Sequence, residues 1–121
     1  MISDIKDKES VRKLLDKFYS RAGNDELLKP IIAGVADSGF LNETLYTYWQ
    51  DAILGDDEAQ EQAKPPKHFQ LMSSPQHFVR WLTIFFQTID DLYIGPIAEK
   101  TKVLVIRKTQ QFQASLEMER F

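Results

Sequence analysis

Apolar side chains recur at three- and four-residue intervals over most of the 121-residue chain, and this spacing limits the possible folds more than any other feature. The clearest case is a largely aromatic stripe made of Phe78, Trp81, Leu82, Phe85, Phe86 and Ile89. One face of an α-helix places side chains at these intervals, whereas a half-buried strand exposes every second residue. The pattern therefore predicts an all-α chain.

Turn and capping residues divide this pattern into four substantial helices. They are expected at about residues 11–22, 40–54, 75–89 and 97–116. Ser10 is the predicted N-cap of the first, and Ser74-Pro75 begins the third as a cap followed by proline at the first helical position. Val103–Ile106 is rich in β-branched residues, but it lies within a long helical pattern and an isolated strand would have no partner.

The connecting segments contain little that predicts regular structure. Asp25 should begin an element of one or two turns, because Pro30 cannot continue a helix interior. Gly55-Asp56-Asp57 should end the second helix, and the polar stretch up to Lys64 is expected to be a solvated loop. Asp90-Asp91 is expected to be a solvated pair that slightly opposes the dipole of its helix.

Composition excludes several classes of function. The net charge of −3 and pI near 5.3 give no basic excess for nucleic acid. There is no cysteine, so disulfides, thiolate zinc sites and iron-sulfur clusters are excluded. No apolar run reaches the roughly 20 residues that cross a bilayer. We expect one domain over residues 1–121, located in the cytoplasm and not in a membrane.

Two histidines, His68 and His77, are the only imidazoles available for metal chemistry. Without further ligands they cannot form a structural zinc site. Haem needs only one imidazole, because the porphyrin fills four positions around the iron. An aromatic stripe through Trp81 and Phe85 that faces Phe18-Tyr19 could form a slot for it. The residues alone leave two alternatives open. The histidine could be an ordinary exposed side chain, and the aromatic stripe could be an ordinary hydrophobic core.

Several segments, in this order, resemble the truncated haemoglobins, and specifically their third group. The matching segments are Leu14–Tyr19, Leu28–Ile31, Tyr48-Trp49, Pro65–His68, His77–Leu82 and Gly95–Ala98. They resemble the first conserved helix, the turn after it, an aromatic pair late in the distal helix, the loop of the proximal histidine, and the openings of the last two helices. The match runs from about residue 10 to residue 115.

The resemblance implies a two-over-two helical sandwich that binds haem b, iron protoporphyrin IX. It makes His68 the axial ligand, with Tyr19 and Trp81 as distal donors that can hold dioxygen. His77 is the rival ligand and is placed at the haem rim, near a propionate. The other cofactor-binding residues implied are Phe18, Ile32, Leu41, Leu45, Lys67, Arg80 and Phe85, with Lys67 and Arg80 as propionate partners.

The chain departs from the group III pattern at two positions. Leu41 occupies the place where these proteins often carry a distal histidine, and a leucine neither donates nor accepts a hydrogen bond. The position of the family's haem-stacking phenylalanine is occupied here by Ile31 or Ile32. Ligand stabilisation would then rest on Tyr19 and Trp81.

The expected function is the binding of a diatomic ligand, dioxygen, nitric oxide or carbon monoxide, at a five-coordinate haem, as in oxygen transport. An enzymatic interpretation, as nitric oxide dioxygenase or with peroxidase-like chemistry, requires a reductase as electron donor, which this chain does not contain. The alternative is a haem-less globin-like domain that binds a partner. Added haem would stabilise the first kind of protein against unfolding and leave the alternative unchanged.

Overall fold

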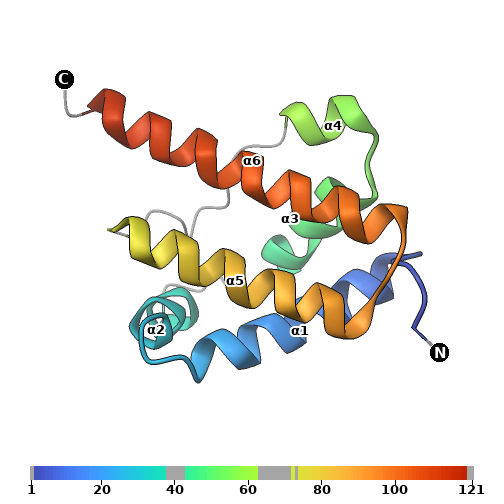
Figure 1. Cartoon of the computed structure of the whole chain (residues 1–121), viewed down its shortest axis with the longest axis horizontal. Coiled ribbons are helices and arrows are strands. Elements are labelled where there is room, and N and C mark those ends of the chain that lie inside the picture. The colour runs from blue at the N-terminus through green and yellow to red at the C-terminus, as the bar shows by residue number, and fades with distance from the viewer. Residues whose placement is uncertain (1, 38–42, 63–71, 73, 120–121) are drawn as a thin grey trace.

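The computed structural model describes residues 2–37, 43–62, 72 and 74–119, and these residues form six helices (Figure 1). In chain order they are α1 (Lys8–Gly23), α2 (Lys29–Asp37), α3 (Glu43–Leu54), α4 (Asp57–Gln62), α5 (Pro75–Leu92) and α6 (Pro96–Glu119). Within this described part, the β-type pairing is an isolated parallel bridge between Ser3 and Tyr93. The predicted all-α fold is confirmed, including a helical Val103–Ile106.

The four longest helices pack as two pairs, one over the other. α5 and α6 run antiparallel as a hairpin in Figure 1, and α1 and α3 pack against each other. Between the layers, α1 contacts α5 and α3 contacts α6. This is the two-over-two helical sandwich of a globin-like fold, as expected. The buried apolar residues of the described helices belong to one hydrophobic core, while the assignment of residues 1–121 to a single domain stays a prediction.

The helix α1 shows how the sequence pattern becomes a core. Its apolar stripe is the face that the structure buries: Val11, Leu14, Leu15, Phe18, Tyr19 and Ala22. Burying a leucine or phenylalanine side chain stabilises the fold by about 1.5–3 kcal/mol. The helix ends at Gly23, as predicted, but its N-cap is Asp7 and not Ser10. The Asp7 carboxylate accepts hydrogen bonds from the Ser10 backbone N–H and hydroxyl, both at 2.8 Å, so Ser10 lies inside the first turn.

Two of the predicted irregular segments are helical. Pro30 is the second residue of α2, where a missing N–H costs nothing because the first turn of a helix has no internal acceptors. Residues 57–62 form α4, whose start is capped by the Asp56 carboxylate accepting from the Ala59 N–H at 2.8 Å. The predicted loop was wrong here because acidic residues at a helix N-terminus favour the helix dipole.

The N-terminal segment secures the start of α6. The two carboxylate oxygens of Asp4 accept from the backbone N–H groups of Ile97 and Ala98, each at 2.9 Å, so a residue more than 90 positions away caps this helix. Gly95, just before α6, has φ of +145° and lies against the Asp4 side chain. The close approach and the backbone conformation both require glycine.

The carboxylates at the end of α5 are ion-paired rather than merely solvated. Asp90 pairs with Lys102 of α6 at 2.5 Å, and Asp91 pairs with Arg21 of α1 at 2.7 Å. These bridges connect α5 to both of its neighbours, which the sequence spacing could not predict. Among the described helices, none is both long and apolar enough to span a bilayer.

Candidate functional site

The centre of the sandwich is a cluster of aromatic rings from three helices. Phe18 of α1, Trp49 of α3, and Trp81 and Phe85 of α5 are all fully buried. Trp81 stacks on Phe85 with ring centroids 4.8 Å apart and on Trp49 at 6.0 Å. Phe18 meets Trp81 edge to face at 5.1 Å. The cluster holds α1, α3 and α5 together at their crossing.

The rings themselves fill the slot that the sequence suggests between the α5 stripe and Phe18. A macrocycle between two rings needs about 7 Å, twice a van der Waals contact. The centroid of Phe18 is only 4.9 Å from that of Phe85 and 5.1 Å from that of Trp81. Phe18 and Phe85 are therefore core residues in contact with each other, and a haem would have to lie on another side of Trp81.

Three polar atoms are buried at this cluster: the Tyr19 hydroxyl oxygen and the indole nitrogens of Trp49 and Trp81. The Tyr19 ring packs edge to face on Phe18 at 5.0 Å, so Tyr19 and Trp81 both flank Phe18. Burial raises the pKa of Tyr19 well above its usual 10.0. The phenol therefore keeps its proton at neutral pH and can donate it.

The apolar residues predicted to line the cofactor lie around this cluster. Ile32 of α2 and Leu45 of α3 are both 8% exposed and belong to the same core as Tyr19. Tyr48, beside Trp49 on α3, is partly buried, and burial raises the pKa of its phenol. His77 lies in the first turn of α5 and is half-buried. Ile32, Leu45 and Tyr48 thus belong to or pack against the same core as the aromatic cluster.

The structure gives Arg80 a protein partner. Its Nε and Nη2 lie 2.7 and 2.6 Å from one carboxylate oxygen of Asp25. The second carboxylate oxygen of Asp25 accepts from the Leu27 and Leu28 N–H groups in the turn before α2. Arg80 therefore connects α5 to that turn, and we leave it out of the proposed haem contacts.

Asp25→Ala should destabilise the protein by about 1–2 kcal/mol, the usual cost of losing a capping side chain. Asp25→Asn should cost less, since the amide oxygen still accepts from the turn. The Arg80 guanidinium lowers the pKa of Asp25 below 3.8. The pairing therefore contributes fully above that pH and is lost as the pH falls through the folded-state pKa.

Urea unfolding at pH 7 and at pH 3 tests this prediction. The wild type should lose more stability between the two pH values than Asp25→Asn does. Glu26→Ala, which changes a neighbouring exposed carboxylate, is the control and should behave as wild type. Equal pH dependence in wild type and Asp25→Asn would contradict the ion-pair role.

Three predicted site residues lie outside the described residues: the candidate axial ligand His68, Lys67 and Leu41. Within the described part of the chain, no group of three or more histidine, aspartate or glutamate side chains could hold a metal ion. Trp49, which stacks in the aromatic cluster, and Asp25, the partner of Arg80, were not predicted from the sequence as site residues. Trp49 belongs to the Tyr48-Trp49 pair that resembles the truncated haemoglobins. Asp25 was predicted only as the residue that begins a short element.

Comparison with known proteins gives one informative relative. The chain is 25% identical over 115 residues to the group 3 truncated hemoglobin ctb of Campylobacter jejuni, an alignment that covers 90% of this chain and 87% of the relative. The chain is a distant relative of that globin. No family model matches, and no solved structure matches. The similarity spans nearly the whole chain and agrees with the two-over-two helical arrangement.

The described residues suit a haem in their chemistry. A haem pocket needs apolar walls and a few donors that face the ligand. Leu45 and Ile32 supply buried apolar surface, and Tyr19 and Trp81 supply donors whose polar atoms are shielded from water.

Proposed function

We propose that this protein binds haem b and a diatomic ligand, with His68 as the axial ligand of the iron. The observation that carries the proposal is the burial of two donors, the Tyr19 hydroxyl and the Trp81 indole, whose rings both pack edge to face on Phe18 in an apolar core. The distant similarity to a group 3 truncated hemoglobin supports it, because that similarity extends over 90% of the chain.

Each residue has a defined part in this proposal. A bound haem would supply an iron that can bind dioxygen, nitric oxide or carbon monoxide. Tyr19 and Trp81 donate hydrogen bonds to the ligand, and burial excludes water that would compete with them. Ile32 and Leu45 would line the pocket, and the family resemblance assigns His77 and Lys67 to its rim as neighbours of the propionates.

An optical spectrum of the purified protein, reconstituted with haem and reduced, tests the proposal. We expect a Soret band that shifts on addition of carbon monoxide, together with a rise in melting temperature on haem binding, because a ligand that binds only the folded state stabilises it. If the apoprotein is folded and haem changes neither its spectrum nor its melting temperature, the chain is a haem-less helical domain instead.

A further inference from the structure

Helix α4 lies at the surface of the protein and buries no side chain of its own. Its residues, Asp57–Gln62, are all exposed or half-buried. An isolated helix of six residues is unstable in water, because the cost of starting the helix is repaid by too few hydrogen bonds. The packing of an apolar face cannot hold α4 in place, so other contacts must do so.

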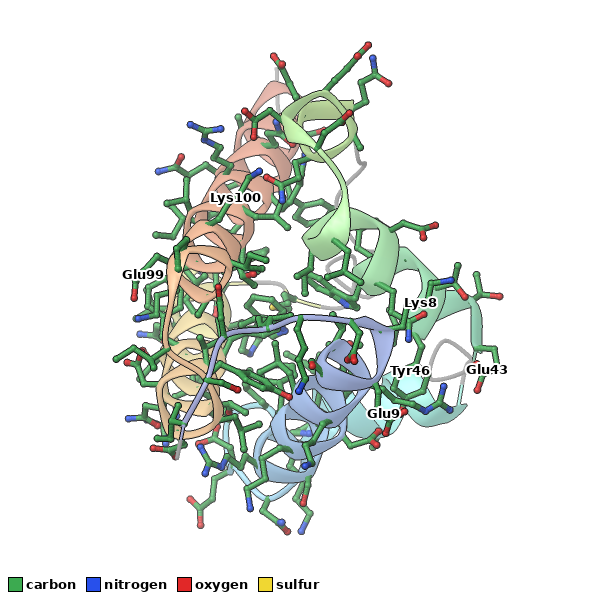
Figure 2. The ribbon with its side chains drawn as sticks, turned by 90° about the vertical axis from the view of Figure 1, so that its right-hand side faces the viewer. Lys8, Glu9, Glu43, Tyr46, Glu99 and Lys100 are labelled. Atoms are coloured by element: carbon green, nitrogen blue, oxygen red, sulfur yellow. The ribbon has the colours of Figure 1, made fainter. Side chains whose placement is uncertain are left out.

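Side chains of α6 reach both ends of α4. At its first residue, the Asp57 carboxylate pairs with the Lys100 amine at 2.7 Å. Near its last residue, the Lys108 amine donates a long hydrogen bond to the Glu61 backbone carbonyl at 3.5 Å. Figure 1 shows α4 beside α6, and Figure 2 shows Glu99, the neighbour of Lys100, on the outer side of α6. Two lysines about two helical turns apart therefore connect α6 to α4.

The burial of Lys108 is unusual for a lysine, since its side chain is 1% exposed. Besides the Glu61 carbonyl, its amine donates to the side-chain oxygen of Gln111 at 3.2 Å. Lysine is almost never fully buried unless its amine has partners, because moving the amine out of water costs free energy. An apolar side chain of similar length would fill the same space without that cost. The lysine is therefore best explained by the carbonyl that it holds at the end of α4.

The end of α4 is where the chain departs toward the proposed iron ligand. His68 comes six positions after Gln62 in the sequence. The next described residue after α4 is Met72, which is 2% exposed and belongs to the hydrophobic core. The span that contains His68 therefore begins at α4 and ends at a core residue. Because a chain reaches at most about 3.3–3.6 Å per residue, the position of its start limits where the imidazole can lie.

We propose that Lys108 is a positioning residue for the iron ligand: its amine fixes the carboxyl end of α4, and thereby the point at which the span with His68 begins. The inference rests on the proposed function and adds a residue to it. Lys108 acts through the backbone of α4 and not through contact with the haem. Lys100 assists at the other end, but an exposed ion pair contributes little, so the larger effect is expected at Lys108.

The first experiment follows hydrogen exchange of the α4 backbone amides in the folded apoprotein. Lys108→Met keeps a long unbranched side chain and removes the amine. It should speed exchange at residues 60–62 about three- to fivefold, as expected for the loss of one hydrogen bond. Lys108→Arg, which keeps N–H donors, should stay near wild type. Global stability should change little, because Glu61 is exposed and water can replace the amine at its carbonyl.

The second experiment uses the haem-reconstituted, reduced protein. Lys108→Met should speed haem dissociation about tenfold, the lower end of the cost of losing a residue that orients a metal ligand. It should also shift or broaden the iron–histidine stretching band in the resonance Raman spectrum, and Lys108→Arg should restore both properties. A merely structural role would leave the band unchanged, because the band reports the bond between iron and imidazole.

Lys102→Met is the matched control on the same helix. The Lys102 amine pairs with Asp90 of α5 and with Glu99 instead of with α4. This variant should change neither α4 exchange nor the stretching band. Lys100→Met is a second test that does not depend on the folding of Lys108→Met, because Lys100 is exposed. It should speed α4 exchange about twofold.

Two results would overturn the inference while haem binding stood. One is unchanged α4 exchange in both Lys108→Met and Lys100→Met. The other is faster α4 exchange in Lys108→Met with no change in haem dissociation or in the stretching band. A wild-type protein that binds no haem would instead overturn the proposed function, and the positioning role of Lys108 with it.

Discussion

His68→Ala should abolish the native haem spectrum of the reconstituted protein, while His77→Ala should leave the Soret band close to its wild-type position. The reason is that the iron needs one protein nitrogen, and the loss of that nitrogen leaves the haem held by apolar contacts alone. Changing a residue that does not bind the iron costs much less than losing the iron ligand itself. Absorbance titrations with haem, followed by reduction and carbon monoxide, give the measurement.

Added imidazole makes this test sharper. If His68→Ala creates a vacancy at the axial position, free imidazole should restore the wild-type spectrum, and it should have no such effect on His77→Ala. The opposite pattern, with His77→Ala losing the spectrum and His68→Ala keeping it, would move the axial ligand to the start of α5. Both variants should keep the helical far-ultraviolet circular dichroism of the apoprotein.

Gly95→Ala should destabilise the protein strongly, by about 2–4 kcal/mol. A Cβ at this position would lie 2.5 Å from the Asp4 carboxyl carbon, and φ of +145° is a conformation that L side chains rarely adopt. Asp4 cannot move aside freely, because its carboxylate caps α6 through Ile97 and Ala98. Urea unfolding at pH 7 measures the loss.

Gly23→Ala provides the control for this prediction. Its Cβ would meet the Ile32 side chain at 3.6 Å, an ordinary van der Waals contact, and the residue is the last of α1. Its stability should stay within about 0.5 kcal/mol of wild type, as expected for a site without strain. If the two alanine variants lost equal stability, the close approach of Asp4 to Gly95 would not be the cause.

Local sequence signals predicted the helices well where periodicity and capping agreed. The stripe from Val11 to Ala22 and the Ser74-Pro75 start both appear as predicted in α1 and α5. They succeed because helix formation and burial of one face depend on residues three or four apart. The predictions failed at Pro30 and at residues 57–62, where proline and acidic residues begin a helix rather than interrupt one.

The candidate site depended more heavily on distant contacts. The sequence, through its resemblance to a family, named Tyr19 and Trp81, and the structure buries the polar atoms of both. The resemblance also predicted Arg80 as a propionate partner, whereas the structure pairs Arg80 with Asp25, which is 55 residues away in the sequence. A charged side chain takes the nearest opposite charge in space, and periodicity carries no information about which one that is.

By itself, then, the sequence determined which residues form helices and which faces of them are apolar, because those properties depend on neighbours within one or two turns. Only the tertiary structure decided that Phe18 and Phe85 close on each other instead of lining a slot, and that Trp49 stacks on Trp81. Those outcomes depend on how α1, α3 and α5 cross, which is set by the packing of whole side chains against one another.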